Sequence, residues 1–323
     1  MGECAAADYH ATYVAVAETM QPGDDPVVVW GMPAAHFCLG QHQSAPAELI
    51  EQPQVPIIRR PLGGGGVWLD SHQACVVLVA PREFFPVRPQ HWYAHALAPI
   101  LQVYREMGWA VTLVQQDIWF NNKKLAGSGA ASIGAAGLVG TSFLLKFPID
   151  EFARLIASPS AGFRLWLQDA LQEAIGSWSD YAAVPDLAWL SLVYRRAATS
   201  LFGWRWEQAL LRDDERAVRD GCHDELIPDS DRQARQVPFG IKIKAHCYLT
   251  ERNFDAVSVR VLTLGQYIGR VALSSVPQLP ERALSATAST PAGLGTVLQA
   301  YLPDAAAEVL AQQILATAFF EEI

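Results

Sequence analysis

Two arginines followed by four glycines form the segment whose residue types and spacing most clearly suggest chemistry. Arg59 and Arg60 precede the glycine run at residues 63–66, and a β-favouring stretch follows at residues 76–79. Glycines leave amide N–H groups open to a ligand, and the always-charged guanidinium matches the oxygens of phosphate or carboxylate. A glycine run alone would favour a flexible surface turn, but with the arginine pair and the strand it favours an anion-binding loop. The spacing matches neither the P-loop nor the GxGxxG pattern.

A second segment joins a predicted strand to a lysine pair and another small-residue loop. It reads Asp117-Ile-Trp-Phe-Asn-Asn-Lys-Lys-Leu-Ala-Gly-Ser-Gly129. Residues 117–120 favour a strand, and the two asparagines that follow are a turn signal. A lysine pair at a hairpin tip is usually solvated. Because Lys123 and Lys124 lie between a strand and a glycine–serine loop, at least one ammonium is a candidate for a fixed positive charge in a pocket.

The composition indicates a large globular chain of about two domains. It has 323 residues, of which 51% are hydrophobic and 18% charged, enough to build a sizeable core. The net charge of −9 argues against a nucleic-acid partner bound through phosphate neutralisation. No apolar run approaches the roughly 20 residues that cross a bilayer, and the N-terminal segment lacks the basic and apolar regions of a signal peptide. We therefore expect a cytoplasmic monomer without a membrane partner.

The cysteines and histidines show no pattern of a disulfide framework or of a metal site. The five cysteines are an odd number, scattered and without a CxxC pair, which suits a reducing compartment. They are Cys4, Cys38, Cys75, Cys222 and Cys247. His36 with His42, or His91 with His95, would share a face if helical, but no acid or cysteine stands at matching ligand spacing. Structural histidines are therefore expected, and no metal ligand is assigned.

Hydrophobic periodicity divides the chain into blocks of different character. Up to about residue 150 it predicts strands and turns with one helix, at residues 92–107. The strands are expected at residues 27–30, 37–40, 75–80, 110–114, 117–120 and 142–147. Helices are expected at residues 163–175, 189–201 and 212–225. After a polar break at residues 228–233, strands are expected at 241–249, 257–264 and 266–273, and a helix at 305–319.

Three motifs occur in the order and spacing of a known family. They are Leu39-Gly40-Gln41-His42-Gln43, then Arg59-Arg60-x-x-Gly63-Gly64-Gly65-x-Val67-x-x-Asp70, and then Asp117 with Asn121-x-Lys123-Lys124-Leu125-Ala126-Gly127-Ser128. In these motifs the chain resembles the lipoate–protein ligase A family of the biotin/lipoate protein ligase superfamily. The resemblance covers most of the first 230 residues, and the remainder is similar to the family's accessory domain more loosely.

The resemblance implies an α+β (mixed α/β) fold. Residues 1–230 would form a class II synthetase/biotin–lipoate ligase-like catalytic domain with a central mixed sheet. Residues 236–323 would form a small α+β accessory domain.

The resemblance also implies a reaction. Members of the family use ATP and Mg²⁺ to activate lipoate as lipoyl-AMP, and then transfer the lipoyl group to a lysine of an acceptor protein. By this resemblance Lys124 is catalytic, and the residues that bind the adenylate and acyl chain are Arg60, Gly64, Gly65, Gly66, Val67, Trp68, Asp70, Asp117, Lys124, Gly127 and Ser128. Asp70 equally fits a carboxylate that caps or stabilises a turn after the glycine loop. The acceptor would be a lipoyl domain, a glycine-cleavage H protein or an H-like carrier.

The sequence departs from the family pattern at three places beside the motifs. Leu69 replaces a usual histidine, Leu138-Val139-Gly140 replaces a common His-His-Gly, and Gly129-Ala130-Ala131 replaces Ala-Gln-Arg. Two alternatives therefore stay open: a cysteine-dependent octanoyl or lipoyl transferase of the same fold, and a non-catalytic lipoate-binding protein. The transferase needs an activated thiolate, and Cys75, at the start of a predicted buried strand, is a poor candidate.

Overall fold

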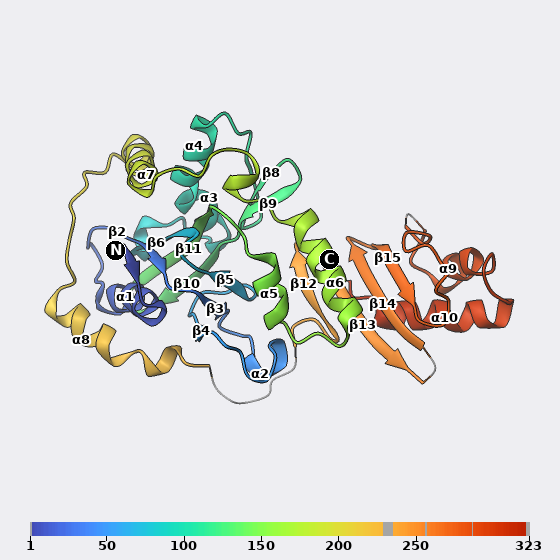
Figure 1. The fold of residues 1–323 in the computed structure, drawn as a ribbon. Helices are drawn as coiled ribbons and strands as arrows, with labels where there is room; N and C mark the ends of the chain where they lie inside the picture. Colours follow the sequence, from blue (N-terminus) through green and yellow to red (C-terminus); the bar gives the residue numbers. More distant parts are fainter. Residues whose placement is uncertain (1, 229–234, 256, 286, 321–323) are drawn as a thin grey trace. The chain divides into compact units, whose positions relative to one another are not determined.

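The computed structural model describes residues 2–228, 235–255, 257–285 and 287–320, and it contains two compact units (Figure 1). The first consists of Met1–Ala45, Gln52–Pro148 and Ile175–Asp231, and the second of Pro46–Glu51, Ile149–Ala174 and Arg232–Ile323. The domains expected at 1–230 and 236–323 stay a prediction. The units differ from them because the segments 46–51 and 149–174 group with the C-terminal part. Of the expected polar break, residues 229–233 lie outside the described residues.

The first unit is built on a five-stranded mixed sheet with the strand order β1-β2-β6-β11-β10. The strands span Glu3–Cys4 (β1), Val27–Pro33 (β2), Gln73–Pro81 (β6), Ala136–Leu144 (β11) and Gly129–Ile133 (β10). β1 pairs with β2 in parallel, and the other neighbouring pairs are antiparallel. The mixed sheet and its surrounding helices confirm the expected α+β class.

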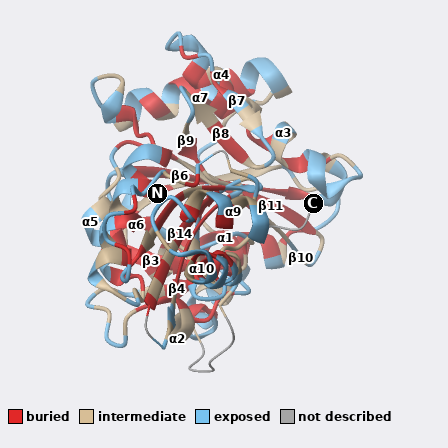
Figure 2. Cartoon of the chain, turned by 90° about the vertical axis from the view of Figure 1, so that its right-hand side faces the viewer, coloured by how far each residue is buried: buried red, intermediate tan, exposed pale blue. Residues whose placement is uncertain are grey.

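β6 is buried along its whole length, and its side chains alternate between two hydrophobic cores. Val77 and Val79 face the core that contains α1, whereas Val76 and Leu78 face the core that contains α3, α4 and α7. These helices span Ala6–Thr19 (α1), Trp92–Ala96 (α3), Ala98–Glu106 (α4) and Leu187–Phe202 (α7). Successive strand residues point to opposite faces, so a strand covered on both faces needs a continuous apolar run. Figure 2 shows β6 and β11 largely in the red of buried residues.

The sequence analysis did not predict α1. Its residues from Tyr9 to Ala17 are buried without interruption, because the helix lies between β6 on one side and α8 (Asp213–Gly221) on another. A helix covered on most of its circumference has no polar stripe, so its sequence lacks the amphipathic period by which helices are identified.

Three predicted elements differ from the observed ones. The helix expected at 92–107 is two helices, interrupted at Leu97, because Pro99 lies in the first turn of α4 and lacks the N–H that a continuous helix needs. The strand expected at 142–147 is the end of β11, which already begins at Ala136. The strand expected at 241–249 is a hairpin, in which His246 has the left-handed φ of 55° typical of a turn.

Two small sheets of the first unit hold the two motif segments. One has the order β4-β3-β5, and the other the order β7-β8-β9. Their strands span Ile57–Arg59 (β4), His36–Leu39 (β3), Val67–Leu69 (β5), Thr112–Val114 (β7), Asp117–Phe120 (β8) and Lys123–Ala126 (β9). Asn121 and Asn122 have φ values of 49° and 63°, as a two-residue turn with both central residues left-handed requires. The asparagine turn is therefore confirmed.

The second unit contains an antiparallel sheet with the order β12-β13-β14-β15. Its strands span Gly240–Lys244, Cys247–Phe254, Val257–Leu264 and Tyr267–Leu273. Val259 and Val261 of β14 pack with α9 (Pro291–Leu298) and α10 (Asp304–Thr317). Arg260, between them, faces the other way and lies 5.2 Å from the Trp166 ring of α6. The alternation gives this sheet one apolar face and one polar face.

Of the remaining helices, α2 and α5 are short, and α6 is as long as α1. α2 spans Ala45–Glu48, α5 Ile149–Leu155 and α6 Ala161–Ala174, and single 3₁₀ turns lie at Arg82–Phe84, Pro89–His91, Trp178–Asp180 and Asp224–Leu226. Within the described residues, every helix is too short or too polar to cross a bilayer.

Candidate functional site

Arg60 holds the glycine loop in shape from within. The residue is 8% exposed, and its guanidinium donates hydrogen bonds to the carbonyl oxygens of Cys38 at 3.0 Å, Gly63 at 2.9 Å and Gly65 at 2.8 Å. Carbonyl oxygens near an always-charged guanidinium offset its charge without a carboxylate. The loop residues Gly64, Gly65 and Val67 are exposed. Arg60 therefore orders the loop from below, while the exposed residues are the part open to a ligand.

The loop lies so close to β3 that two neighbouring positions exclude a side chain. A Cβ on Gly40 would lie 1.9 Å from the Gly64 carbonyl oxygen, and a Cβ on Gly66 would lie 2.6 Å from the Phe37 ring. Gly64 itself has a φ of 94°, a conformation that favours glycine. The Leu39-Gly40 motif and the glycine run are thus two sides of one close contact between backbones.

Lys124 and Asp117 form an ion pair across the second motif. The Lys124 Nζ lies 2.9 Å from Asp117 Oδ1, and the two side chains are 25% and 10% exposed. Asp117 stands on β8 and Lys124 on the antiparallel β9. A Cβ on Gly127 would lie 3.0 Å from Lys124 Nζ, so Gly127 leaves room beside the ammonium. Lys124 is therefore a fixed, partly exposed positive charge.

The loop after the lysine pair is fixed by its own hydrogen bonds. The Ser128 hydroxyl donates to the carbonyl oxygen of Gln116, and the Thr141 hydroxyl of β11 donates to that of Gly127 at 2.9 Å. Ser128, which the resemblance implies is a binding residue, thus anchors this loop.

The two motifs meet at the start of β10. The Gly63 N–H donates to the Ala130 carbonyl oxygen at 3.3 Å, and a Cβ on Gly129 would lie 2.7 Å from the Gly63 carbonyl oxygen. Gly129 follows directly on the Gly127-Ser128 pair that borders Lys124. Segments more than fifty residues apart in sequence therefore form one continuous backbone surface, with the Lys124–Asp117 pair at its edge.

The carboxylate of Asp70 stabilises the turn that follows β5. Its carboxylate accepts hydrogen bonds from Trp68 Nε1 at 2.7 Å and from the His72 backbone N–H at 2.8 Å. Trp68 is buried, and its carbonyl oxygen accepts from the Gln73 side chain at 2.6 Å. These bonds fit the turn-acid interpretation of Asp70, and they make Trp68 and Asp70 supports beneath the exposed loop.

The departures from the family pattern pack beneath the glycine loop. A Cβ on Gly140 would lie 2.5 Å from the Leu62 side chain, so glycine lets Leu62 sit under the loop. Leu138 and Val139 of β11 are buried. Since β11 points them to opposite cores, they are parts of the hydrophobic interior.

Tyr93 of α3 is a residue of this region that the sequence analysis missed. Burial raises the pKa of the Tyr93 phenol, a hydrogen bond from the Ala130 backbone lowers it, and the Asp117 charge raises it. The hydroxyl thus lies near Asp117 and the start of β10. The sequence held no signal for it, because a helix residue well upstream comes close only through the fold.

None of the five thiols, all of which lie in the described residues, has the environment of an activated nucleophile. Burial raises the pKa of Cys4, Cys38, Cys75, Cys222 and Cys247, the last to about 11. Cys75 is buried within β6, as expected. A nucleophilic thiol needs a lowered pKa and access.

Solved structures with the same fold include three proteins of low sequence identity, two of which are described as lipoate protein ligases. The bipartite lipoate protein ligase of Thermoplasma acidophilum, described with its E2 lipoyl domain, has a TM-score of 0.63 and 16% identity over 70% of this chain and 90% of its own. A lipoate-protein ligase A bound with ATP has a TM-score of 0.58 and 15% identity over 69% and 92%. LipL1 of P. falciparum in complex with lipoate has a TM-score of 0.54 and 10% identity over 98% of each chain.

These similarities show that the chain has the fold of these solved lipoate protein ligases. A comparison of the sequence with curated proteins found no match. Residues 9–182 match the family described as the lipoyl protein ligase A/B catalytic domain. Because this match covers more than half of the 323 residues, the protein belongs to the lipoyl protein ligase A/B catalytic domain family.

Proposed function

We propose that the protein is an ATP-dependent lipoate–protein ligase, which forms lipoyl-AMP and transfers the lipoyl group to a lysine of an acceptor protein. The observation that carries this proposal is that the glycine loop contacts the start of β10, just after Gly127, which borders the Lys124–Asp117 pair. Such a surface offers backbone amides and one fixed cation to a phosphate-bearing acyl group. Two similar solved structures, a lipoate-protein ligase A bound with ATP and LipL1 in complex with lipoate, support the same substrates.

In the first step a carboxylate oxygen of lipoate attacks the α-phosphorus of ATP, an O–P bond forms, and pyrophosphate leaves with the electron pair of the broken bond. Negative charge gathers on the phosphoryl oxygens. The Lys124 ammonium, held 2.9 Å from Asp117, would stabilise that charge, and the exposed loop at Gly64 and Gly65 would supply amide donors. A lost donor of this kind raises the barrier by about 3 kcal/mol.

In the second step the neutral ε-amine of the acceptor lysine attacks the carbonyl carbon and a C–N bond forms. The C–O bond to the phosphate breaks, AMP leaves with its electron pair, and the nitrogen gives up a proton to water to become the amide. The amine must first lose a proton, which at pH 7 costs roughly 4 to 5 kcal/mol for an ordinary lysine pKa near 10.4. Lys124 would contact the carbonyl oxygen as its negative charge grows. Asp117 would hold the Lys124 ammonium in place through their ion pair.

The other predicted site residues support these steps from beneath. Arg60, Trp68 and Asp70 would keep the glycine loop in its binding shape, with Gly66 and Val67 at its end and Ser128 anchoring the facing loop. Mg²⁺ would arrive with ATP and bind chiefly to phosphate oxygens. A carboxylate is the donor that this ion prefers from protein, and Asp117 is the one beside Lys124. We propose residues 1–230 as the catalytic domain and 236–323 as the accessory domain.

A lipoyl domain is the acceptor that the Thermoplasma relative, described with its E2 lipoyl domain, supports. The glycine-cleavage H protein and H-like carriers are the other predicted acceptors, and they should be tested in the same experiment. Mass spectrometry of these apo acceptors, incubated with lipoate, ATP and the protein, identifies the one that gains a lipoyl group.

Lipoate-dependent exchange of pyrophosphate into ATP tests the first step alone. The wild-type protein should catalyse it, Lys124→Ala should abolish it, and Lys123→Ala should retain it as the matched control. A Lys124→Ala variant that still forms lipoyl-AMP would show that Lys124 has another role. A wild-type protein that binds lipoate but never exchanges would be a non-catalytic lipoate-binding protein.

The cysteine-dependent transferase is the alternative that the thiols disfavour, because burial raises all their pKa values. Cys75→Ser should keep full ligase activity. A folded Cys75→Ser protein without acyl transfer, together with transfer from an octanoyl carrier protein by the wild type, would favour the transferase instead.

A further inference from the structure

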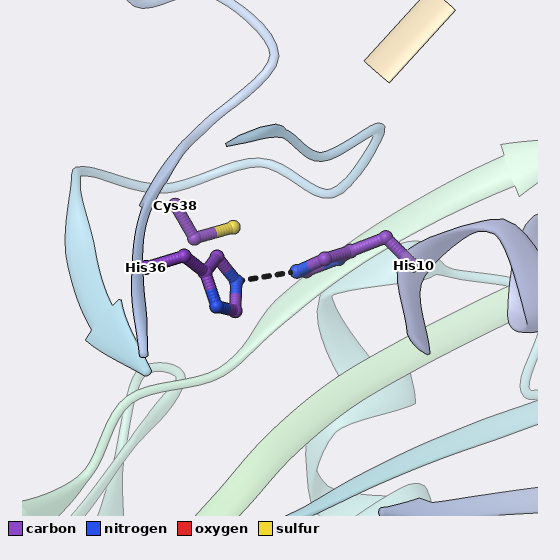
Figure 3. A group of neighbouring side chains, drawn as sticks. All are labelled: His10, His36 and Cys38. Atoms are coloured by element: carbon purple, nitrogen blue, oxygen red, sulfur yellow. Dashed lines mark hydrogen bonds between the residues drawn. The ribbon is translucent and has the colours of Figure 1, made fainter. Parts of the chain in front are cut away.

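His10, His36 and Cys38 form a buried cluster that the ligase steps do not use (Figure 3). His36 and Cys38 are two residues apart on β3, so the period of the strand places both on one face. Figure 3 shows that face turned towards His10 of α1. The three possible ligand atoms lie within 4.8 Å of one another.

The outer nitrogen of each imidazole already has a partner. His36 Nδ1 lies 2.7 Å from the Ala34 carbonyl oxygen, and His10 Nδ1 lies 2.8 Å from the Tyr13 hydroxyl. A carbonyl oxygen only accepts, so His36 Nδ1 carries a proton and His36 Nε2 keeps a free electron pair. The two Nε2 atoms are 2.9 Å apart, which requires the proton between them to belong to His10.

This arrangement suits a metal ion in place of that proton. The Tyr13 hydroxyl both donates and accepts, so the His10 proton can move from Nε2 to Nδ1 and leave both Nε2 atoms as ligands. Imidazoles that bind metals usually donate their other N–H to a protein oxygen in this way. Burial lowers the pKa of both histidines, that of His36 to about 4, which keeps them in the neutral form that a metal binds.

We propose that His10 Nε2, His36 Nε2 and Cys38 Sγ bind one soft, closed-shell metal ion, monovalent copper. Thiolate and imidazole are ligands of Cu(I) and Zn(II). Binding would release one proton to water, that of the Cys38 thiol, because the His10 proton only changes nitrogen. Three-coordinate geometry with metal–nitrogen bonds of about 2.0 Å would widen the distance between the two Nε2 atoms by roughly half an ångström.

The charge of the surroundings selects the monovalent ion. The Arg60 guanidinium lies 3.5 Å from Cys38 Sγ, and all three ligand residues are at most 2% exposed. A Cu(I) ion with one thiolate is neutral overall, whereas Zn(II) with the same ligands would leave a positive charge buried beside a guanidinium. An unpaired buried charge is strongly unfavourable. Arg60 also favours the thiolate form of Cys38, because it lowers the pKa that burial raises.

A competition assay with the full-length protein tests the proposal. Under anaerobic, reducing conditions the protein should take one equivalent of Cu(I) from the chromogenic chelator bathocuproine disulfonate. Cys38→Ser should weaken this binding at least tenfold. Cys75→Ser, which changes a similarly buried thiol on β6, should leave it unchanged. Copper binding that Cys38→Ser does not weaken would be adventitious and would overturn the proposal.

Two further measurements keep the test valid if Cys38→Ser fails to fold. X-ray absorption of the copper-loaded wild type should show one sulfur and two nitrogen neighbours, and a shell without sulfur would overturn the proposal. Zn(II), tested in the same assay, should bind more weakly than Cu(I). One tightly held zinc with the same ligands, and no copper, would contradict the charge argument. None of these readouts depends on ligase activity.

Discussion

The glycine loop and the Lys124 hairpin carry the same kind of sequence signal, a cation beside small residues, but they use it differently. Arg60 turns its charge inward, where three carbonyl oxygens of its own loop and of β3 accept from it. Lys124 stays partly exposed and pairs with one carboxylate. A cation in a motif therefore either builds the site or acts in it, and its partners decide which.

The largest effect should follow from exchanging the type of cation at the acting position. Lys124→Arg keeps the charge but replaces a compact ammonium by a planar fork, which is larger than the space that the missing side chain of Gly127 leaves beside the Nζ, where even a Cβ would lie only 3.0 Å away. We expect pyrophosphate exchange to fall by about 10²–10³-fold with little change in thermal stability. Parallel measurement of exchange rate and melting temperature checks this. Near-normal exchange by Lys124→Arg would mean that charge alone, without its position, is sufficient.

The next effect concerns the contact between the backbones of β3 and the glycine loop. Gly40→Ala places a Cβ 1.9 Å from the Gly64 carbonyl oxygen, so the loop must move, at a cost of about 1–3 kcal/mol of unfolding free energy. Pyrophosphate exchange should fall as well, because the loop has moved. Gly65→Ala is the matched control, because a Cβ there meets nothing within 4 Å. Chemical denaturation of both variants measures the difference, and equal stability would contradict the close contact.

A smaller effect is expected at the cation that builds the site. Arg60→Lys removes the fork that reaches the Cys38, Gly63 and Gly65 carbonyl oxygens together. Buried acceptors left without donors should lower the free energy of unfolding by about 1–3 kcal/mol. The KM for ATP should rise by a larger factor than kcat falls. Arg59→Lys serves as the control on the neighbouring residue. If Arg60→Lys lost activity with unchanged stability, Arg60 would act on the substrate directly.

The sequence allowed the prediction of elements whose signal is local. β2, β3 and β6 follow from apolar runs, and the Asn121-Asn122 turn follows from its two asparagines. The family motifs indicated that the glycine loop and Lys124 belong together. α1 could not be predicted, since a buried helix lacks a polar face.

The contacts of individual side chains could not be predicted either, because they involve backbone and side chains far away in the sequence. Arg60 meets the Cys38 carbonyl oxygen, and His10 meets His36, only after α1 and β3 have packed. At helical spacing the histidine pairs have no acid or cysteine beside them, so no metal ligand was assigned from the sequence. His36 and Cys38 instead share a face through the period of a strand. Spacing is informative only once the type of element is known.

The smallest effect should separate a supporting carboxylate from an acting one. Asp70→Asn keeps the size of the side chain but leaves one of its two donors, Trp68 Nε1 or the His72 N–H, without an acceptor. We expect a loss of about 1 kcal/mol of unfolding free energy and exchange within a few-fold of wild type. Asp117→Asn, which removes the charge beside Lys124, should instead reduce exchange strongly. If Asp70→Asn lost exchange while keeping its stability, Asp70 would take part in the reaction, and the division between building and acting residues would have to include it.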